Sequence, residues 1–180
     1  AQQIRREFPG IPVHPVVADF MKPFDLPSPA VMPLKNVVYF PGSTIGNFEE
    51  EAAIELLRVM HDEAGEHGAL LIGVDLQKDP RIIDRAYNDS AGVTAQFNLN
   101  MLRHLNNSYG TNFDLDAFEN RAEYDEDRGR VVLELVSQKV QTVSVGDAEI
   151  NIENGEAILT EYSHKYTLEG FARMAGEAGF

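Results

Sequence analysis

An apolar run, an amphipathic segment and a second apolar run follow one another between residues 36 and 74. The first run is NVVYF at residues 36–40, and the second is ALLIGV at residues 69–74. Between them, residues 49–67 carry apolar side chains at helical spacing and begin with three glutamates, which the positive end of a helix favours. Strand, helix and strand in this order predict a βαβ unit, whose two parallel strands end at the same sheet edge. The unbroken second run is typical of a strand covered on both faces.

The pattern changes after this unit. Helical spacing and then strand-like alternation are found in residues 79–87, 94–109, 131–145, 147–152 and 157–162. Asn154-Gly155 predicts a hairpin turn before the last of these strands. This succession predicts a helix pair followed by an antiparallel meander.

Two terminal segments complete the expected fold. Residues 11–17 form a short extended run with Asp19 and Phe20 at its C-terminal end, and Thr167 caps a final helix at 168–178. We therefore predict an α/β fold in which a doubly wound sheet is interrupted by an α+β insertion at residues 78–165.

The amino-acid composition argues against several classes of binding partner. Acidic residues outnumber basic ones 29 to 15, and the formal net charge of −14 opposes binding to nucleic acid or to anionic membrane surfaces. The chain has no cysteine, which excludes disulfides and thiolate chemistry. It also has no apolar run of 18 residues, so the sequence predicts neither membrane insertion nor export, and we expect a cytoplasmic protein.

The loop FPGSTIGNF follows the first predicted strand, where open α/β sheets bind ligands. Gly42 and Gly46 permit positive φ or a close backbone approach, and the Asn47 amide both donates and accepts hydrogen bonds. These residues could hold a small polar ligand. An ordinary turn with Asn47 as a helix N-cap explains them equally well. A phosphate-binding loop is less well supported, because the Gly-Lys-Ser/Thr ending is missing.

Two further positions carry polar chemistry. Glu161 and Ser163 lie two residues apart on a predicted strand, hence on one face, and could receive a donor-rich group such as an imidazole or amine. The alternative is a solvated strand face. Tyr87 follows a predicted helix, and it could either contact a ligand or be an ordinary exposed tyrosine at a helix end. The five histidines show no metal-binding spacing, so we expect no metal site.

Several ordered motifs carry a family resemblance. FPGSTIGNF, GVDLQKD, RAYNDSAGVTAQFNLNML, NFDLDAFE and TEYSHKY occur in this order over essentially the whole chain. The sequence resembles the histidine-specific Nα-methyltransferases, which transfer methyl groups from S-adenosylmethionine to L-histidine and form hercynine in ergothioneine biosynthesis. The resemblance implies a class I methyltransferase with a Rossmann-like sheet. Residues 1–77 and 166–180 would then form part of the cofactor domain, and residues 78–165 the substrate-binding insertion.

The resemblance also implies roles for single residues. Asp19 and Phe20 match the family's contact to the cofactor adenine, although Ala18 replaces a glycine there. Gly42 and Asn47 match the loop that meets the cofactor's methionine side and the substrate's amino end.

The remaining matches concern the substrate. Tyr87 matches the tyrosine at the substrate carboxylate, and Glu161 with Ser163 matches the pair that grips the imidazole. Methyl transfer is an in-line displacement that mainly requires alignment, and no residue is an obvious general base.

One expected motif is absent. No Gly-x-Gly turn precedes Asp19, although this fold uses a glycine-rich turn after its first strand. The expected sheet is therefore an incomplete Rossmann-like one, and we expect a partial chain that does not catalyse methyl transfer alone. Methylation of another amino acid or indole derivative, and a non-catalytic fragment, remain the alternatives.

Overall fold

The computed structural model describes all 180 residues, which form helices and strands in two compact units. The first unit consists of Ala1–Gly42, Glu50–Gly73 and Glu169–Phe180. The second unit consists of Ser43–Glu49 and Val74–Leu168. The mixed α/β class predicted from the sequence is confirmed.

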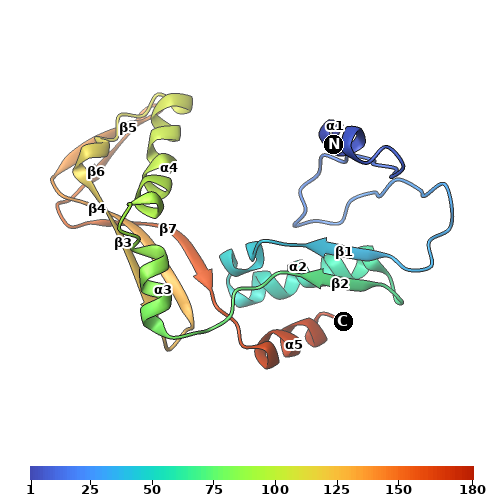
Figure 1. The fold of residues 1–180 in the computed structure, drawn as a ribbon. Coiled ribbons are helices and arrows are strands. Elements are labelled where there is room, and N and C mark those ends of the chain that lie inside the picture. Colours follow the sequence, from blue (N-terminus) through green and yellow to red (C-terminus); the bar gives the residue numbers. More distant parts are fainter. The chain divides into compact units, whose positions relative to one another are not determined.

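The first unit is built on the predicted βαβ element. Strand β1 (Val37–Phe40) is followed by helix α2 (Glu50–Ala64) and strand β2 (Ala69–Ile72). The two strands pair in parallel along their whole length, as Figure 1 shows. Helix α2 packs on both strands through one apolar stripe, formed by Ala53, Leu56, Leu57, Met60 and Ala64. The βαβ prediction is therefore confirmed.

The second face of this small sheet is open. Val37, Tyr39 and Leu71 have exposed fractions of 56%, 67% and 60%. The expectation that residues 69–74 form a strand covered on both faces is therefore wrong for the chain as it stands. A parallel sheet is covered on both faces only where helices pack on both, and α2 packs on one of them.

The N-terminal part of the first unit contains one short helix, α1 (Gln2–Glu7), and then neither helix nor strand until residue 37. The extended run expected at residues 11–17 forms no strand. Pro12 and Pro15 lack the N–H donors that a ladder requires. The predicted final helix is present as α5 (Leu168–Glu177), which buries Phe171 and Met174.

The second unit contains two antiparallel sheets. Three strands pair in the order β3 (Phe118–Asp125), β4 (Arg130–Ser137) and β7 (Ala157–His164). Strands β5 (Gln141–Val145) and β6 (Ala148–Ile152) form a separate pair. The antiparallel class was predicted, but the chain does not form a simple meander, because β7 returns to β4 across the β5–β6 hairpin.

Two local expectations were wrong. The sequence predicts one alternating segment at residues 131–145, whereas these residues belong to two strands, of which β4 ends at Ser137 and β5 begins at Gln141. Asn154-Gly155 does form a turn, with φ of +85° at Gly155, but the strands it joins do not pair with each other. Strand β3 was not predicted at all, since half of the residues in its sequence FENRAEYD are charged.

Helices α3 (Pro80–Tyr87) and α4 (Val93–Tyr109) follow each other along one side of β3 and β4 (Figure 1). Asp79 caps α3 by accepting a hydrogen bond from the Arg81 backbone N–H at 2.9 Å. The buried cluster under α4 consists of Leu102, Phe118, Leu135, Val143 and Ile152. The cluster under α3 consists of Ile83, Ala122, Val131 and Leu133.

Two 3-10 helices lie in the second unit: η1 (Thr44–Asn47) and η2 (Leu115–Ala117). None of the helices in the structure has both the length and the apolar character that crossing a bilayer requires.

Candidate functional site

The turn after β1 has a strained backbone. Gly42 and Ser43 have consecutive positive φ angles of +80° and +57°. For serine this left-handed conformation is unfavourable, and such residues cluster at functional sites. The Ser43 hydroxyl accepts a hydrogen bond from the Asp75 backbone N–H at 2.9 Å, which fixes the loop at this point.

The rest of the loop is pressed against the end of β7. A Cβ on Gly46 would lie 2.9 Å from the backbone oxygen of His164, so only glycine permits this approach. Asn47 ends η1 and is exposed. It precedes the first residue of α2, Glu50, by three positions, so it does not occupy the N-cap position of that helix. Its amide makes no hydrogen bond in the structure and is available to a ligand.

A hydroxyl pair lies between α3 and β7. The Tyr87 hydroxyl oxygen, at the end of α3, lies 2.7 Å from Ser163 Oγ on β7. Sequence reasoning placed both residues at a candidate site but gave them separate partners. The structure instead brings the two hydroxyls into direct contact.

Glu161 shares the face of β7 with Ser163. The ladder pairs Ser163 with Val131 and Glu161 with Leu133, and the register shifts immediately beyond, between Leu133 and Glu134. Such irregularities re-aim side chains beside functional sites. The Glu161 carboxylate is half-buried and accepts no hydrogen bond from the protein.

Burial raises the pKa of the Glu161 carboxyl, and the nearby positive charge of Lys165 partly opposes that rise. A desolvated carboxylate without a donor is unfavourable for the free protein. It gains a strong, charge-assisted hydrogen bond when a ligand brings an N–H group.

Lys165 is the residue that sequence reasoning missed. Its side chain is 1% exposed, and its ammonium nitrogen lies 2.9 Å from the Tyr87 hydroxyl and 2.6 Å from Ser163 Oγ. It also lies 4.9 Å from the centre of the Tyr87 ring. A fully buried lysine is rare unless its charge is compensated.

Asp75 supplies the compensating charge. One of its oxygens lies 3.5 Å from the Lys165 nitrogen, and the other lies 2.7 Å from the nitrogen of Lys78. Burial opposes ionisation of Asp75, but the hydrogen bond from Lys78 and the charges of Lys165 and Lys78 outweigh it and lower the pKa of its carboxyl. Asp75 is therefore a stable anion beside Lys165.

A second charged cluster joins η1 to the strands. Arg130 at the start of β4 is buried, donates to Glu49 at 2.7 Å, and places its guanidinium carbon 3.7 Å from the centre of the Tyr162 ring. The His164 ring stacks on Tyr166, whose hydroxyl donates to the backbone oxygen of Ile45 at 3.3 Å. These contacts hold the segment that carries Asn47 against the end of β7.

The remaining predicted residues lie in the first unit. The half-exposed Phe20 ring lies 5.8 Å from the ring of Phe40, the last residue of β1, with the two rings tilted by 59°. Asp19 is exposed. Its carboxylate accepts from the Met21 backbone N–H and pairs with Lys22, and both contacts lower the pKa of Asp19.

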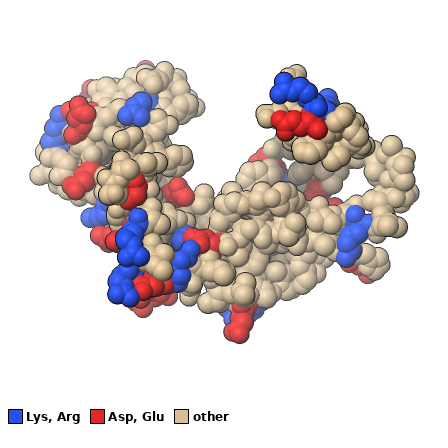
Figure 2. Space-filling model, viewed as in Figure 1, with Lys and Arg blue, Asp and Glu red and all other residues tan.

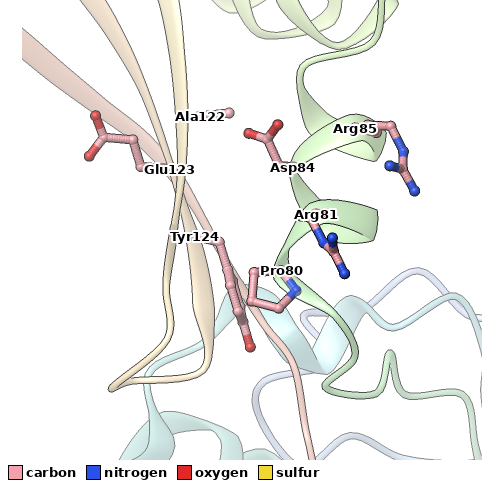
Figure 3. Close-up of a pocket in the computed structure, with 7 residues that line it drawn as sticks. All are labelled: Pro80, Arg81, Asp84, Arg85, Ala122, Glu123 and Tyr124. Carbon is pink, nitrogen blue, oxygen red and sulfur yellow. The ribbon is translucent and has the colours of Figure 1, made fainter.

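An open hollow lies elsewhere in the second unit, between α3 and β3. Its lining residues are Pro80, Arg81, Asp84, Arg85, Ala122, Glu123 and Tyr124. Figure 3 shows the Tyr124 ring beside Pro80, while the Arg81 and Arg85 side chains extend away from the strands. None of the predicted site residues lines this hollow. No group of three or more histidine, aspartate or glutamate side chains is arranged to hold a metal ion.

The family model described as "histidine-specific methyltransferase, SAM-dependent" matches residues 1–180, which is the whole chain. The chain belongs to this family. The predicted family resemblance is therefore confirmed.

Individual members of the family agree with this assignment. Histidine N-alpha-methyltransferase of Mycolicibacterium smegmatis is 38% identical over 179 residues, which cover 98% of this chain and 54% of that protein. The protein of the same name from Mycobacterium tuberculosis is 33% identical over 182 residues, covering 99% of this chain and 56% of that protein. The chain thus spans about half the length of the curated relatives that it matches.

A more distant relative differs in its substrate. The L-tryptophan methyltransferase of Psilocybe serbica is 29% identical over 146 residues, covering 79% of this chain and 40% of that protein. Related sequences thus serve more than one amino acid.

The predicted residues of this histidine-specific methyltransferase family member fall into two groups. Asp19, Phe20 and Gly42 lie in the first unit, whereas Asn47, Tyr87, Glu161 and Ser163 lie in the second. Within the second unit the structure joins Tyr87 to Ser163. Lys165 lies one residue beyond the end of β7, at the two-residue spacing of Glu161 and Ser163, but that spacing alone does not indicate that its side chain is buried.

Proposed function

We propose that the full-length protein transfers methyl groups from S-adenosylmethionine to the α-amino group of L-histidine and forms hercynine for ergothioneine biosynthesis. The family match over residues 1–180 carries this proposal. The pair Glu161 and Ser163, on one face of β7, gives it a chemical basis within this chain.

The imidazole of the substrate fits the two polar groups of β7. Glu161 is a half-buried carboxylate without a hydrogen-bond donor, and the Ser163 hydroxyl lies two residues away. A neutral imidazole offers one N–H and one acceptor nitrogen, so it can engage both groups. An apolar side chain would leave the Glu161 carboxylate unpaired, which costs several kcal/mol and rejects that substrate.

The carboxylate and amino ends of histidine are assigned to the other predicted residues. We infer that Tyr87 helps to position the substrate carboxylate and that the Asn47 amide reaches the amino end. Gly42 provides backbone contacts near the amino group. Anchoring both ends of a small substrate aligns its amine with the methyl donor, and such alignment is the main requirement of a displacement reaction. No residue of the chain is assigned as general base.

The first unit has features that fit the methyl donor. The half-exposed Phe20 ring at the end of β1 offers an apolar surface for an adenine ring, and nothing lies within 4 Å of where a Cβ on Gly42 would be. S-adenosylmethionine supplies an electrophilic methyl group when bound. We propose Asp19, Phe20 and Gly42 as its contacts.

We further propose that β1 and β2 belong to a Rossmann-like sheet that further strands of the full-length protein complete. Support comes from their parallel pairing, from the exposed apolar face of β1 and β2, and from relatives about twice as long as this chain. In this arrangement residues 1–77 and 166–180 form part of the cofactor domain and residues 78–165 form the substrate-binding insertion.

A cytoplasmic protein without nucleic-acid partners is consistent with the charge distribution. On the face seen in Figure 2, basic side chains of the second unit lie beside acidic ones. Arg81 pairs with Asp79 at 2.7 Å and Arg128 lies 3.9 Å from Asp125. Locally neutralised arginines do not form the positive surface that phosphate backbones require.

Methylation of tryptophan or another amino acid is the second candidate, and the relative from Psilocybe serbica favours it. A substitution at Glu161 separates the two. In the full-length protein, Glu161→Ala should raise the KM for L-histidine at least tenfold, because the imidazole N–H loses its charged acceptor. If histidine kinetics are unchanged while another amine is the better substrate, the histidine assignment is wrong. A further alternative is a non-catalytic fragment, which calorimetry of residues 1–180 with S-adenosylmethionine would exclude by showing ordinary cofactor affinity.

A further inference from the structure

Lys165 is a buried cation whose contacts constrain the direction of the hydrogen bonds that the Tyr87 and Ser163 hydroxyls make. Its nitrogen lies within hydrogen-bond distance of the Tyr87 hydroxyl and of Ser163 Oγ. A lysine ammonium has three donors and no acceptor. Both hydroxyl oxygens must therefore accept a hydrogen bond from Lys165.

The two hydroxyls also contact each other at 2.7 Å. Each hydroxyl owns one hydrogen, and only one of these two hydrogens can lie between the oxygens. The other hydrogen has to be donated away from the pair. Because Lys165 takes an acceptor position on each oxygen, the pair has fewer acceptor positions left and faces its surroundings chiefly as a hydrogen-bond donor.

Asp75 stabilises the ammonium group that donates these hydrogen bonds. Its carboxylate lies 3.5 Å from the Lys165 nitrogen and gives the buried ammonium an anionic partner. The Lys165 side chain is 1% exposed, so water does not compete for its hydrogens. The nitrogen also lies 3.2 Å from the backbone oxygen of Ser163. Its three hydrogens are therefore all engaged within the protein, and Lys165 does not reach the substrate itself.

We propose that Lys165 is a positioning residue that makes the Tyr87–Ser163 pair a hydrogen-bond donor and so selects a substrate with an acceptor nitrogen there. This inference rests on the proposed function. With ionised Glu161 as the neighbouring acceptor, the site presents one donor and one acceptor. A neutral imidazole has the complementary set, one acceptor nitrogen and one N–H. An indole has the N–H alone.

The test uses the full-length protein and the variant Lys165→Met, which keeps the length of the side chain and removes its charge and donors. Lys78→Met is the matched control, because Lys78 pairs with the same Asp75 but contacts neither hydroxyl. Wild-type methyl transfer to L-histidine is measured first, so that failure of the proposed function is seen separately.

Lys165→Met should raise the KM for L-histidine at least tenfold, with the kcat and the KM for S-adenosylmethionine changed less than threefold. Lys78→Met should change each value less than twofold. The double variant Lys165→Met with Ser163→Ala should be no worse for histidine than Ser163→Ala alone, because Lys165 acts through that hydroxyl. An unchanged KM for histidine would overturn the proposal. Equal increases in the KM values for histidine and for S-adenosylmethionine would also overturn it.

A measurement on the wild-type protein keeps the proposal testable if the lysine variant does not fold. A histidine analogue with a pyrrole ring keeps the N–H for Glu161 but has no acceptor nitrogen. Its KM should be at least tenfold above that of histidine. Equal KM values would show that the hydroxyl pair does not act as a donor, and would overturn the proposal.

Discussion

The backbone oxygen of His164 lies 2.9 Å from the position that a Cβ on Gly46 would occupy. This contact joins the loop after β1 to the end of β7, and it sets the place of Asn47 relative to Ser163 within the second unit. A backbone oxygen cannot rotate away as a flexible side chain would, so any substitution at Gly46 has to move one of the two segments.

We predict that Gly46→Ala lowers the free energy of unfolding by about 1–3 kcal/mol, in the range for overpacked sites. It should also raise the KM for histidine, because Asn47 moves with the loop. Denaturant unfolding and steady-state kinetics measure the two effects. Gly176→Ala is the control: nothing lies within 4 Å of its Cβ position in α5, so it should be neutral or slightly stabilising. Equal stability of both variants would contradict the steric account.

Glu161 should make the protein less stable at neutral pH than a neutral side chain would. Its pKa is raised by burial, so its stabilising contribution is present below the ordinary glutamate pKa and is lost as the pH rises through the folded-state value. Glu161→Gln should therefore be more stable than the wild type at pH 7.5, and the difference should vanish near pH 4. Thermal unfolding at both pH values is the measurement, and a less stable variant at pH 7.5 would refute the assignment.

Asp75 affects the pH dependence of stability in the opposite direction to Glu161. Lysine contacts lower its pKa, so its contribution to stability is present above the ordinary aspartate pKa and is lost as the pH falls through the lower folded-state value. Asp75→Asn should destabilise the protein at neutral pH, because buried Lys165 loses its countercharge, and it should weaken the loss of stability on acidification. Denaturant titrations at pH 7 and pH 4 test this. A variant with unchanged acid sensitivity would argue against the pair.

The Arg130 contact with Glu49 predicts a further stability effect. Glu49→Ala leaves a buried guanidinium without its anionic partner, although Glu49 itself is 58% exposed. We expect a loss of about 1–3 kcal/mol, as for a buried charged group that loses a hydrogen bond. Glu66→Ala removes an equal charge at an exposed position and should have little effect. Chemical denaturation compares the two, and similar losses for both would mean that the Arg130 contact contributes nothing specific.

The sequence predicts the elements whose side-chain period is regular. The βαβ unit, α3 and α4 follow from apolar spacing, and Glu161 with Ser163 follows from the two-residue period of a strand. The two-residue spacing also includes Lys165, but a lysine between a histidine and a tyrosine is typical of an ordinary solvent-exposed residue. Only the packing of α3 against the sheet shows that it is buried.

Other features depend on contacts that no local pattern encodes. The charged sequence of β3 becomes a strand because it pairs with the apolar β4. Arg130 and Glu49 lie 81 residues apart, and their pairing is set by how η1 meets the strands. The prediction for residues 11–17 was wrong because a strand requires a second strand to pair with, and no strand pairs with these residues.

The central claim is tested most directly by mass spectrometry of the full-length protein's products with S-adenosylmethionine and equal amounts of L-histidine and L-tryptophan. The account predicts that histidine is converted to its trimethylated form while tryptophan is recovered unchanged. Methylated tryptophan with unmodified histidine would contradict it.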